Sequence, residues 1–67
     1  MIEFGVIKEY DGYCGIIISN NNIEYLLLKK EILYESPNIG DVVSFKSEII
    51  NTETEKKYIA RFVKKKI

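Results

Sequence analysis

The chain consists of short apolar runs, each ended by a turn signal, and this pattern limits it to a few β architectures. The runs are rich in β-branched and aromatic residues, and in one of them Val43 and Phe45 alternate with polar residues. Alternation with a period of two is typical of a strand that buries one face. The sequence therefore predicts five strands, at residues 2–10, 13–19, 23–28, 41–50 and 57–65.

Turn residues separate these strands. Asp11-Gly12 follows the first strand, and three asparagines at 20–22 follow the second, where Asn tolerates the left-handed backbone of a tight hairpin. Residues 51–55 are polar and predict the last turn. Residues 29–33 interrupt the β pattern and predict a short helical turn between the third and fourth strands.

A chain of 67 residues has room for a single domain, 1–67, and a closed sheet would hide its strand edges. Gly5 and Gly15 lie inside strands, where glycine often marks a bulge or a sharp bend. In the last strand, simple alternation puts Ala60 and Phe62 on one face and Val63 on the other. These features predict a small all-β barrel. Its core is expected to contain Ile7, Ile17 or its neighbour Ile16, Leu27, Val43, Phe45 and Val63.

The residue types argue against catalysis and against a metal site. The chain has no histidine, and its one cysteine, Cys14, cannot form a disulfide within the chain. A general base would have to be a carboxylate or a lysine, and no Gly-rich phosphate loop is present. We expect a protein that is not an enzyme and that uses no cofactor or metal, with Cys14 as a small strand residue.

Charge and hydropathy also limit the possible partners and location. Ten basic and ten acidic residues cancel, so the overall field does not attract nucleic acid. The start of the chain lacks the features of a signal peptide, and no apolar run is long enough to cross a membrane, which predicts a cytoplasmic protein. Basic residues nevertheless cluster near the end, where they either solubilise the chain or contact nucleic acid: Lys56, Lys57, Arg61, Lys64, Lys65 and Lys66.

Five segments occur in the order of the motifs of cold-shock domains. Residues 5–10 resemble their opening Gly-x-Val-Lys-Trp-Phe strand, and residues 12–17 resemble their Lys-Gly-Tyr/Phe-Gly-Phe-Ile motif. Residues 24–32 are similar to their Asp-Val-Phe-Val-His stretch and the Ile that closes the next turn. Residues 39–45 resemble Gly-Gln-x-Val-x-Phe, and residues 60–63 lie where the family has Ala-x-Asn-Val.

This resemblance to the cold-shock domain family covers nearly the whole chain. It implies a five-stranded antiparallel OB-fold barrel with a short helical turn between strands 3 and 4. It also implies binding of single-stranded RNA or DNA through the outer face of strands 1–3, where aromatic side chains stack on bases. On this basis the contact residues are expected to be Lys8, Tyr10, Tyr13, Lys29 and Lys30.

The departures from the family pattern predict weak binding. Glu9 replaces the family's Trp, while Leu26 and Leu28 replace its Phe and His. Each stacked base contributes roughly 1–3 kcal/mol, so the loss of these contacts is comparable with the whole of a micromolar affinity. We expect a dissociation constant for single strands weaker than about 1 µM.

Two alignments of the second strand remain open. If Gly12 matches the first motif glycine, Tyr13 takes an outward stacking position. If Gly15 matches the second, Cys14 and Ile16 point outward and Tyr13 turns inward, because a slip of one residue reverses every side chain. The Gly-Tyr pair directly after the turn favours the first alignment.

The sequence leaves two functions open. The first is single-stranded nucleic-acid binding, which requires no change of role from the family. The second is a protein-interaction or structural module, in which an outward Leu26 and Leu28 beside Tyr10 form an apolar patch for a protein partner.

Overall fold

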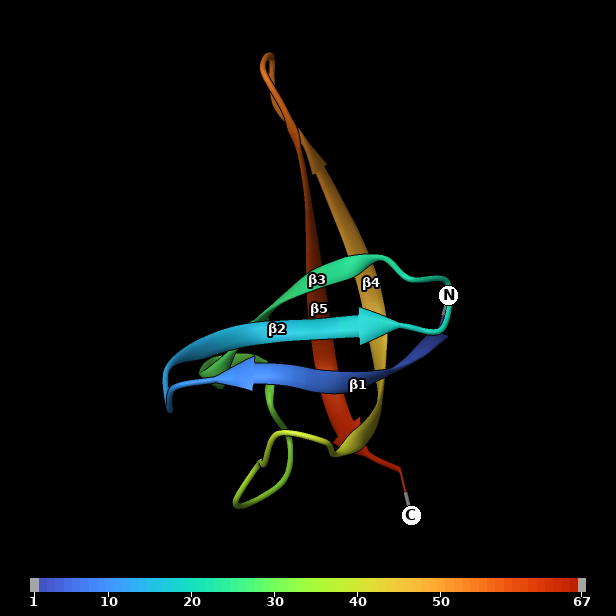
Figure 1. Cartoon of the computed structure of the whole chain (residues 1–67). Coiled ribbons are helices and arrows are strands. Elements are labelled where there is room, and N and C mark those ends of the chain that lie inside the picture. Colours follow the sequence, from blue (N-terminus) through green and yellow to red (C-terminus); the bar gives the residue numbers. More distant parts are fainter. Residues whose placement is uncertain (1, 67) are drawn as a thin grey trace.

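The computed structural model describes residues 2–66 and is a closed five-stranded barrel (Figure 1). Each strand end lies within one residue of its predicted position, and the expected helical turn is a single 3-10 turn. Met1 and Ile67, the ends of the predicted domain, lie outside the described residues. The elements are β1 (Ile2–Tyr10), β2 (Cys14–Ser19), β3 (Glu24–Leu28), η1 (Lys29–Glu31), β4 (Val42–Asn51) and β5 (Lys56–Lys65).

Strand order in the barrel is β1-β2-β3-β5-β4, and one pairing differs from the prediction. Four neighbouring pairs are antiparallel, but β3 and β5 are parallel, with Leu26 opposite Ile59. A parallel bridge between Ile32 and Val63 continues this contact. The expectation of a purely antiparallel barrel was therefore wrong. The reason is geometric, since a ring of five strands cannot alternate in direction at every pair.

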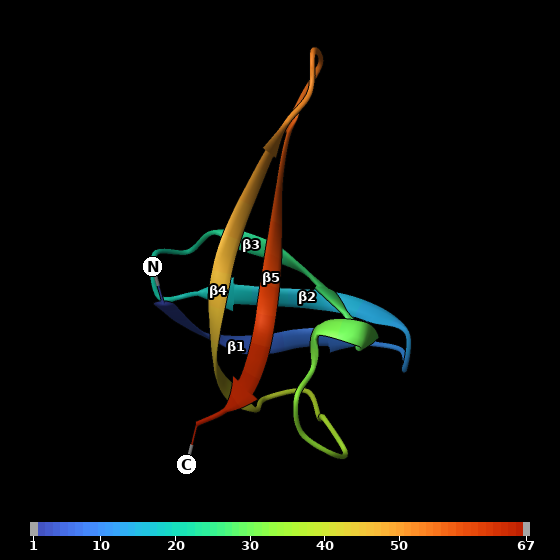
Figure 2. The same ribbon diagram turned by 180° about the vertical axis from the view of Figure 1, so that it is seen from behind.

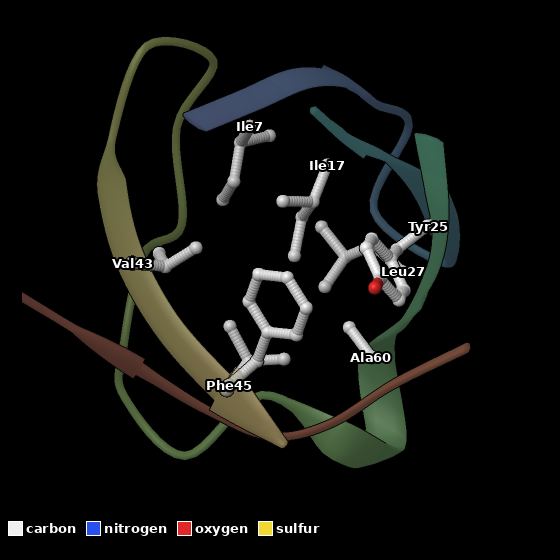
Figure 3. Packing of buried hydrophobic residues seen from close by; sticks show 8 residues of the cluster. Ile7, Ile17, Tyr25, Leu27, Val43, Phe45 and Ala60 are labelled. Atoms are coloured by element: carbon white, nitrogen blue, oxygen red, sulfur yellow. The ribbon is translucent and has the colours of Figure 1, made fainter. Parts of the chain in front are cut away.

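Strand alternation places the core where the sequence predicts it (Figure 3). The rings of Tyr25 and Phe45 pack edge to face, with ring centroids 4.8 Å apart. In β2 the buried residue is Ile17, and Ile16 is only half-buried. Tyr25, Ile59 and Ala60 join the core in addition to the predicted residues, which are all buried: Ile7, Ile17, Leu27, Val43, Phe45 and Val63.

The two strand glycines allow close approaches of the backbone, and Gly15 lies opposite the predicted kind of irregularity, a bulge. A Cβ atom on Gly5 would lie 2.5 Å from the carbonyl oxygen of Ile18, and one on Gly15 would overlap the carbonyl of Glu9. The β1–β2 register shifts between Ile7 and Glu9, which is a β-bulge opposite this contact. Because bulges increase local bending, this one helps a short sheet to close.

The β4–β5 hairpin extends beyond the rest of the barrel and gives the molecule its long dimension, 36 Å against 22 and 17 Å (Figure 1). The hydroxyl of Thr52 closes the hairpin tip by accepting a hydrogen bond from the Glu55 N–H, at 3.0 Å. η1 and the loop after it lie toward the opposite end (Figure 2). None of the helices among residues 2–66 has the length and apolar character needed to span a membrane.

Candidate binding surfaces

The outer face of β1, β2 and β3, where the resemblance implies base stacking, is aliphatic at its centre. Ile18 pairs with Val6 on one side and with Glu24 on the other. Ile16 pairs with Leu26, whose side chain is 40% exposed. Aliphatic side chains have no π-face on which a base can stack, so this face lacks the main source of affinity for unpaired bases.

The register of β2 follows the alignment based on Gly15. Cys14 and Ile16 lie opposite outward residues of β3, and Ile17 is buried. The favoured alignment based on Gly12 was therefore wrong for the strand. Tyr13 nevertheless does not turn inward: it precedes β2, and its side chain is 76% exposed. Its backbone N–H donates to Asp11 Oδ1 at 2.8 Å, which holds it in the turn.

The predicted contact residues do not form one site. Tyr13 lies beside Lys29, whose Nζ is 5.8 Å from the ring centroid, and Lys8 is exposed on β1. Tyr10 is half-buried and packs against the core, so it presents less ring surface to a base than an exposed aromatic would. Lys30 is on the far side of η1, where it lines a different hollow.

A shallow hollow of about 490 Å³, the apolar–acidic hollow, occupies the end of this face near the β1 bulge. Two of its lining residues are the carboxylates Glu9 and Asp11. Backbone N–H groups of Cys14 and Tyr13 donate to Asp11 and keep the pKa of that carboxyl below its usual range, so it is an anion at neutral pH. Its lining comprises Glu9, Tyr10, Asp11, Cys14, Gly15, Ile16, Leu26 and Ile39.

A second surface lies on the outer side of β1, β4 and β5. Of its residues, the sequence singled out only Lys64 and Lys66, as part of the basic cluster near the end of the chain. Ser44 pairs with Phe4 on β1 and with Lys64 on β5. The Nζ of Lys66 is 4.5 Å from the centroid of the Phe4 ring, which is 38% exposed. We refer to this surface as the basic face and define it by five exposed residues: Phe4, Lys46, Phe62, Lys64 and Lys66.

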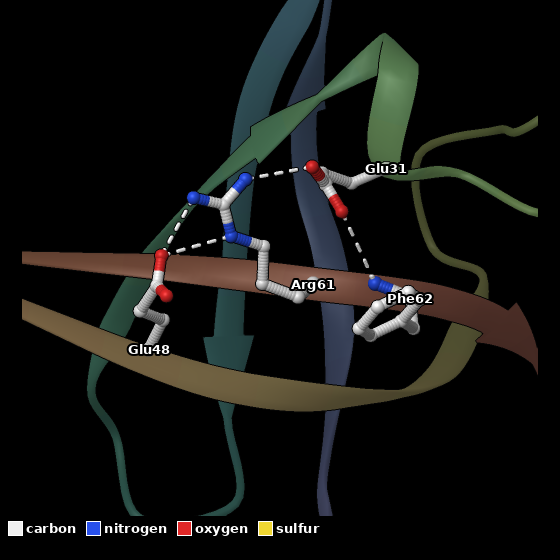
Figure 4. A network of polar contacts seen from close by, with 4 residues as sticks. All are labelled: Glu31, Glu48, Arg61 and Phe62. Atoms are coloured by element: carbon white, nitrogen blue, oxygen red, sulfur yellow. Dashed lines mark hydrogen bonds and ion pairs between the residues drawn. The ribbon is translucent and has the colours of Figure 1, made fainter.

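Arg61 forms ion pairs with Glu31 and Glu48, two carboxylates that line a hollow together with Phe62 (Figure 4). Its Nη2 and Nε donate to Glu48 Oε1 at 2.6 and 2.9 Å, and its Nη1 donates to Glu31 Oε2 at 2.7 Å. The hydrogen bond from Arg61 is the main reason that the pKa of Glu31 is lowered. Within residues 2–66, the three lysines of the basic face have no ion-pair partner, so their charge is uncompensated.

Phe62 reaches this surface through a second bulge. The β4–β5 register shifts between Ser44 and Lys46, and Phe62 has a left-handed φ of 52°. The predicted alternation of this strand was therefore wrong, because the extra residue lets Ala60 and Val63 both point inward while Phe62 is 58% exposed. The family motif places Asn here, a residue that tolerates this conformation better than Phe does. A hollow of about 560 Å³, lined partly by Lys30, adjoins the ring.

Comparisons with known proteins do not assign this chain to a family. The chain matches no protein-family model, and no curated protein is similar to it in sequence. Among residues 2–66, no three or more His, Cys, Asp or Glu side chains lie close enough together to hold a metal ion.

Proposed function

We propose that this protein is a non-enzymatic, cytoplasmic binder of single-stranded nucleic acid, RNA in particular, and that it binds through the basic face. The observation that carries the proposal is the combination of two exposed rings, Phe4 and Phe62, with three lysines that have no carboxylate partner among residues 2–66. Proteins that bind single strands combine aromatic stacking platforms with a basic surface that follows the backbone.

The position of each group supports this role. Lys64 lies one strand away from Ser44 and two strands away from Phe4 in the same row, and Lys46 lies in the next outward row of β4. Successive outward residues of a strand are about 7 Å apart, so the lysines are spread along the face and are not stacked at one point. Two stacked bases supply roughly 2–6 kcal/mol, which agrees with the expectation of weak binding.

The face implied by the family resemblance is less suited to a polyanion. Glu9 and Asp11 flank its hollow and repel phosphate groups, and the ring of Tyr10 packs against the core. Lys8 and the Tyr13–Lys29 pair remain as separate basic points at this side of the barrel. In this proposal they extend the path of a longer strand and do not form the primary site.

The test is a fluorescence titration with a short labelled oligouridine at several salt concentrations, with oligodeoxythymidine of the same length as the DNA arm. Neutralising three phosphates predicts a slope of log affinity on log salt near −2, because each contact on a single strand contributes about 0.7. The double substitution Lys64→Gln with Lys66→Gln should make the slope shallower by about 1.4.

The matched control is Lys56→Gln with Lys57→Gln. It removes the same charge from the exposed hairpin arm, away from the basic face, and should leave the slope unchanged. Equal effects of the two double variants would mean that only net charge matters and would overturn the assignment of the basic face. If the protein binds neither oligonucleotide at low salt, the proposed function is wrong.

A further inference from the structure

We propose that the apolar–acidic hollow on β1–β3 is a docking site for a polypeptide segment that carries a large aliphatic side chain next to a lysine or arginine. This surface is separate from the basic face, so the inference does not depend on the proposed function. The argument rests on the apolar floor, on the unpaired carboxylates and on the rigidity of the site.

The floor of the hollow is formed by apolar side chains that are partly exposed to water, which does not stabilise the barrel by itself. Leu26 pairs with Ile16 across β2 and β3, and Ile39 projects beside them from the loop before β4, with 65% of its surface exposed. The volume of about 490 Å³ lies within the range of known ligand pockets. Exposed apolar patches rimmed by polar residues are typical of interaction sites.

The rim selects the charge of the occupant. Neither Glu9 nor Asp11 has an ion-pair partner anywhere in residues 2–66. Asp11 Oδ1 is fixed in direction by two backbone N–H groups, from Tyr13 at 2.8 Å and from Cys14 at 2.9 Å. Two unpaired carboxylates beside an apolar floor attract a cation and repel a phosphate, which favours a basic polypeptide over a nucleic acid.

The backbone holds this arrangement in place before any partner binds. The β1 bulge orients Glu9 outward, and Gly15 brings β2 into direct contact with the carbonyl of that residue. Because Glu9, Ile16 and Leu26 belong to paired strands and Asp11 is held by two backbone hydrogen bonds, an occupant orders little of this part of the hollow when it binds. A site that is already ordered before binding loses less conformational entropy when the partner binds, which favours a higher affinity.

The test uses two acetylated peptide amides, Gly-Leu-Arg-Leu-Gly and Gly-Leu-Glu-Leu-Gly, titrated into ¹⁵N-labelled protein at millimolar concentration. We expect saturable amide shifts that centre on Glu9, Ile16 and Leu26, with the arginine peptide bound about threefold more tightly, as for an exposed ion pair. Glu9→Gln, which leaves the Asp11 carboxylate in place, should reduce this preference, and Glu9→Lys, which cancels the charge of Asp11, should abolish it. Glu24→Lys, the same charge change elsewhere on the outer face of β3, should leave it unchanged.

Several outcomes would overturn the inference. These are the absence of localised shifts with either peptide, equal affinity for both peptides, and a preference that survives Glu9→Lys in a variant that keeps the wild-type spectrum elsewhere. Leu26→Asp, at a position that is already 40% exposed, should weaken peptide binding but leave oligouridine binding intact. If Leu26→Asp instead abolishes oligouridine binding, the hollow belongs to the nucleic-acid surface and this inference fails while the proposed function stands.

Discussion

Phe62 combines an exposed ring with a backbone conformation that bulky residues seldom adopt. Its φ of 52° lies in the left-handed region, which costs roughly 1–2 kcal/mol for a residue with a Cβ atom. Its backbone N–H points to Glu31 Oε1 at 3.4 Å, and its neighbours Ala60 and Val63 are buried. Strain of this kind is often found at functional sites, which agrees with a role for the ring in binding.

Substitution of Phe62 separates backbone strain from binding. Phe62→Asn and Phe62→Ala both remove the ring, but only Asn tolerates the left-handed backbone well. We expect the Asn variant to exceed the Ala variant by about 1 kcal/mol in the free energy of unfolding, measured by urea denaturation. Both variants should bind oligouridine more weakly than the wild type. Equal stability of the two variants would show that the backbone at position 62 is not strained. Wild-type affinity for oligouridine in both variants would show that the Phe62 ring does not take part in binding.

At the scale of the elements, Arg61 links η1 to the ladder formed by β4 and β5. It lies on β5 and bonds to Glu48 on β4 and to Glu31 on η1. η1 has only three residues, and no side chain caps its start. The position of this turn therefore depends on contacts with β5, among which the Glu31 carboxylate supplies the charged one.

Glu31→Gln keeps the size of the side chain but removes its charge. A hydrogen bond to a charged group contributes about 1.5 kcal/mol, so local opening of this region should become about tenfold more frequent. The measurement is hydrogen exchange of the amide of Leu33, which donates to the Val63 carbonyl at 2.8 Å. Glu35→Gln, in the exposed loop, is the control and should change nothing. Unchanged protection of Leu33 in Glu31→Gln would show that the ion pair does not hold η1.

At the scale of the whole molecule, ionisable groups predict a broad plateau of stability. Hydrogen bonds hold the pKa of Asp11, of Asp41 and of Glu31 below their ordinary values of 3.8, 3.8 and 4.5. The unfolded chain then binds more protons at acid pH, so stability is complete above about pH 4.5 and is lost as pH falls below it. Burial and the hydrogen bond to Asp41 raise the pKa of Tyr34 above 10.0, so stability is also lost as pH rises past that value.

Urea denaturation over a pH series tests this profile. With no histidine in the sequence, the free energy of unfolding should be nearly constant from about pH 5 to about pH 9 and should fall below about pH 4.5 and above about pH 10. Tyr34→Phe should flatten the alkaline limb and leave the acid limb almost unchanged. A clear stability step near neutral pH would contradict this account of the charges.

The strands, the turns and most of the core follow from the sequence alone, because they depend on local information. Alternation identifies Val43 and Phe45 as inward residues, and the left-handed φ of 66° at Asn22 is a conformation that Asn tolerates. Even the presence of a parallel pair could have been deduced, since a closed ring with an odd number of strands must contain one, although the strand order decides that it joins β3 and β5.

Only the tertiary structure decided which faces can bind. Each of the two bulges adds one residue to a strand and reverses the alternation beyond it, which is how Phe62 turns outward while Ala60 and Val63 stay buried. Likewise, Phe4 and Lys64 lie near opposite ends of the chain. They share one face only because β1 and β5 both pair with β4, where each of the two residues lies opposite Ser44. A local sequence pattern does not specify which distant strands pair. The sequence therefore predicts a barrel, but it does not predict that the lysines and the phenylalanine rings of the basic face share one surface.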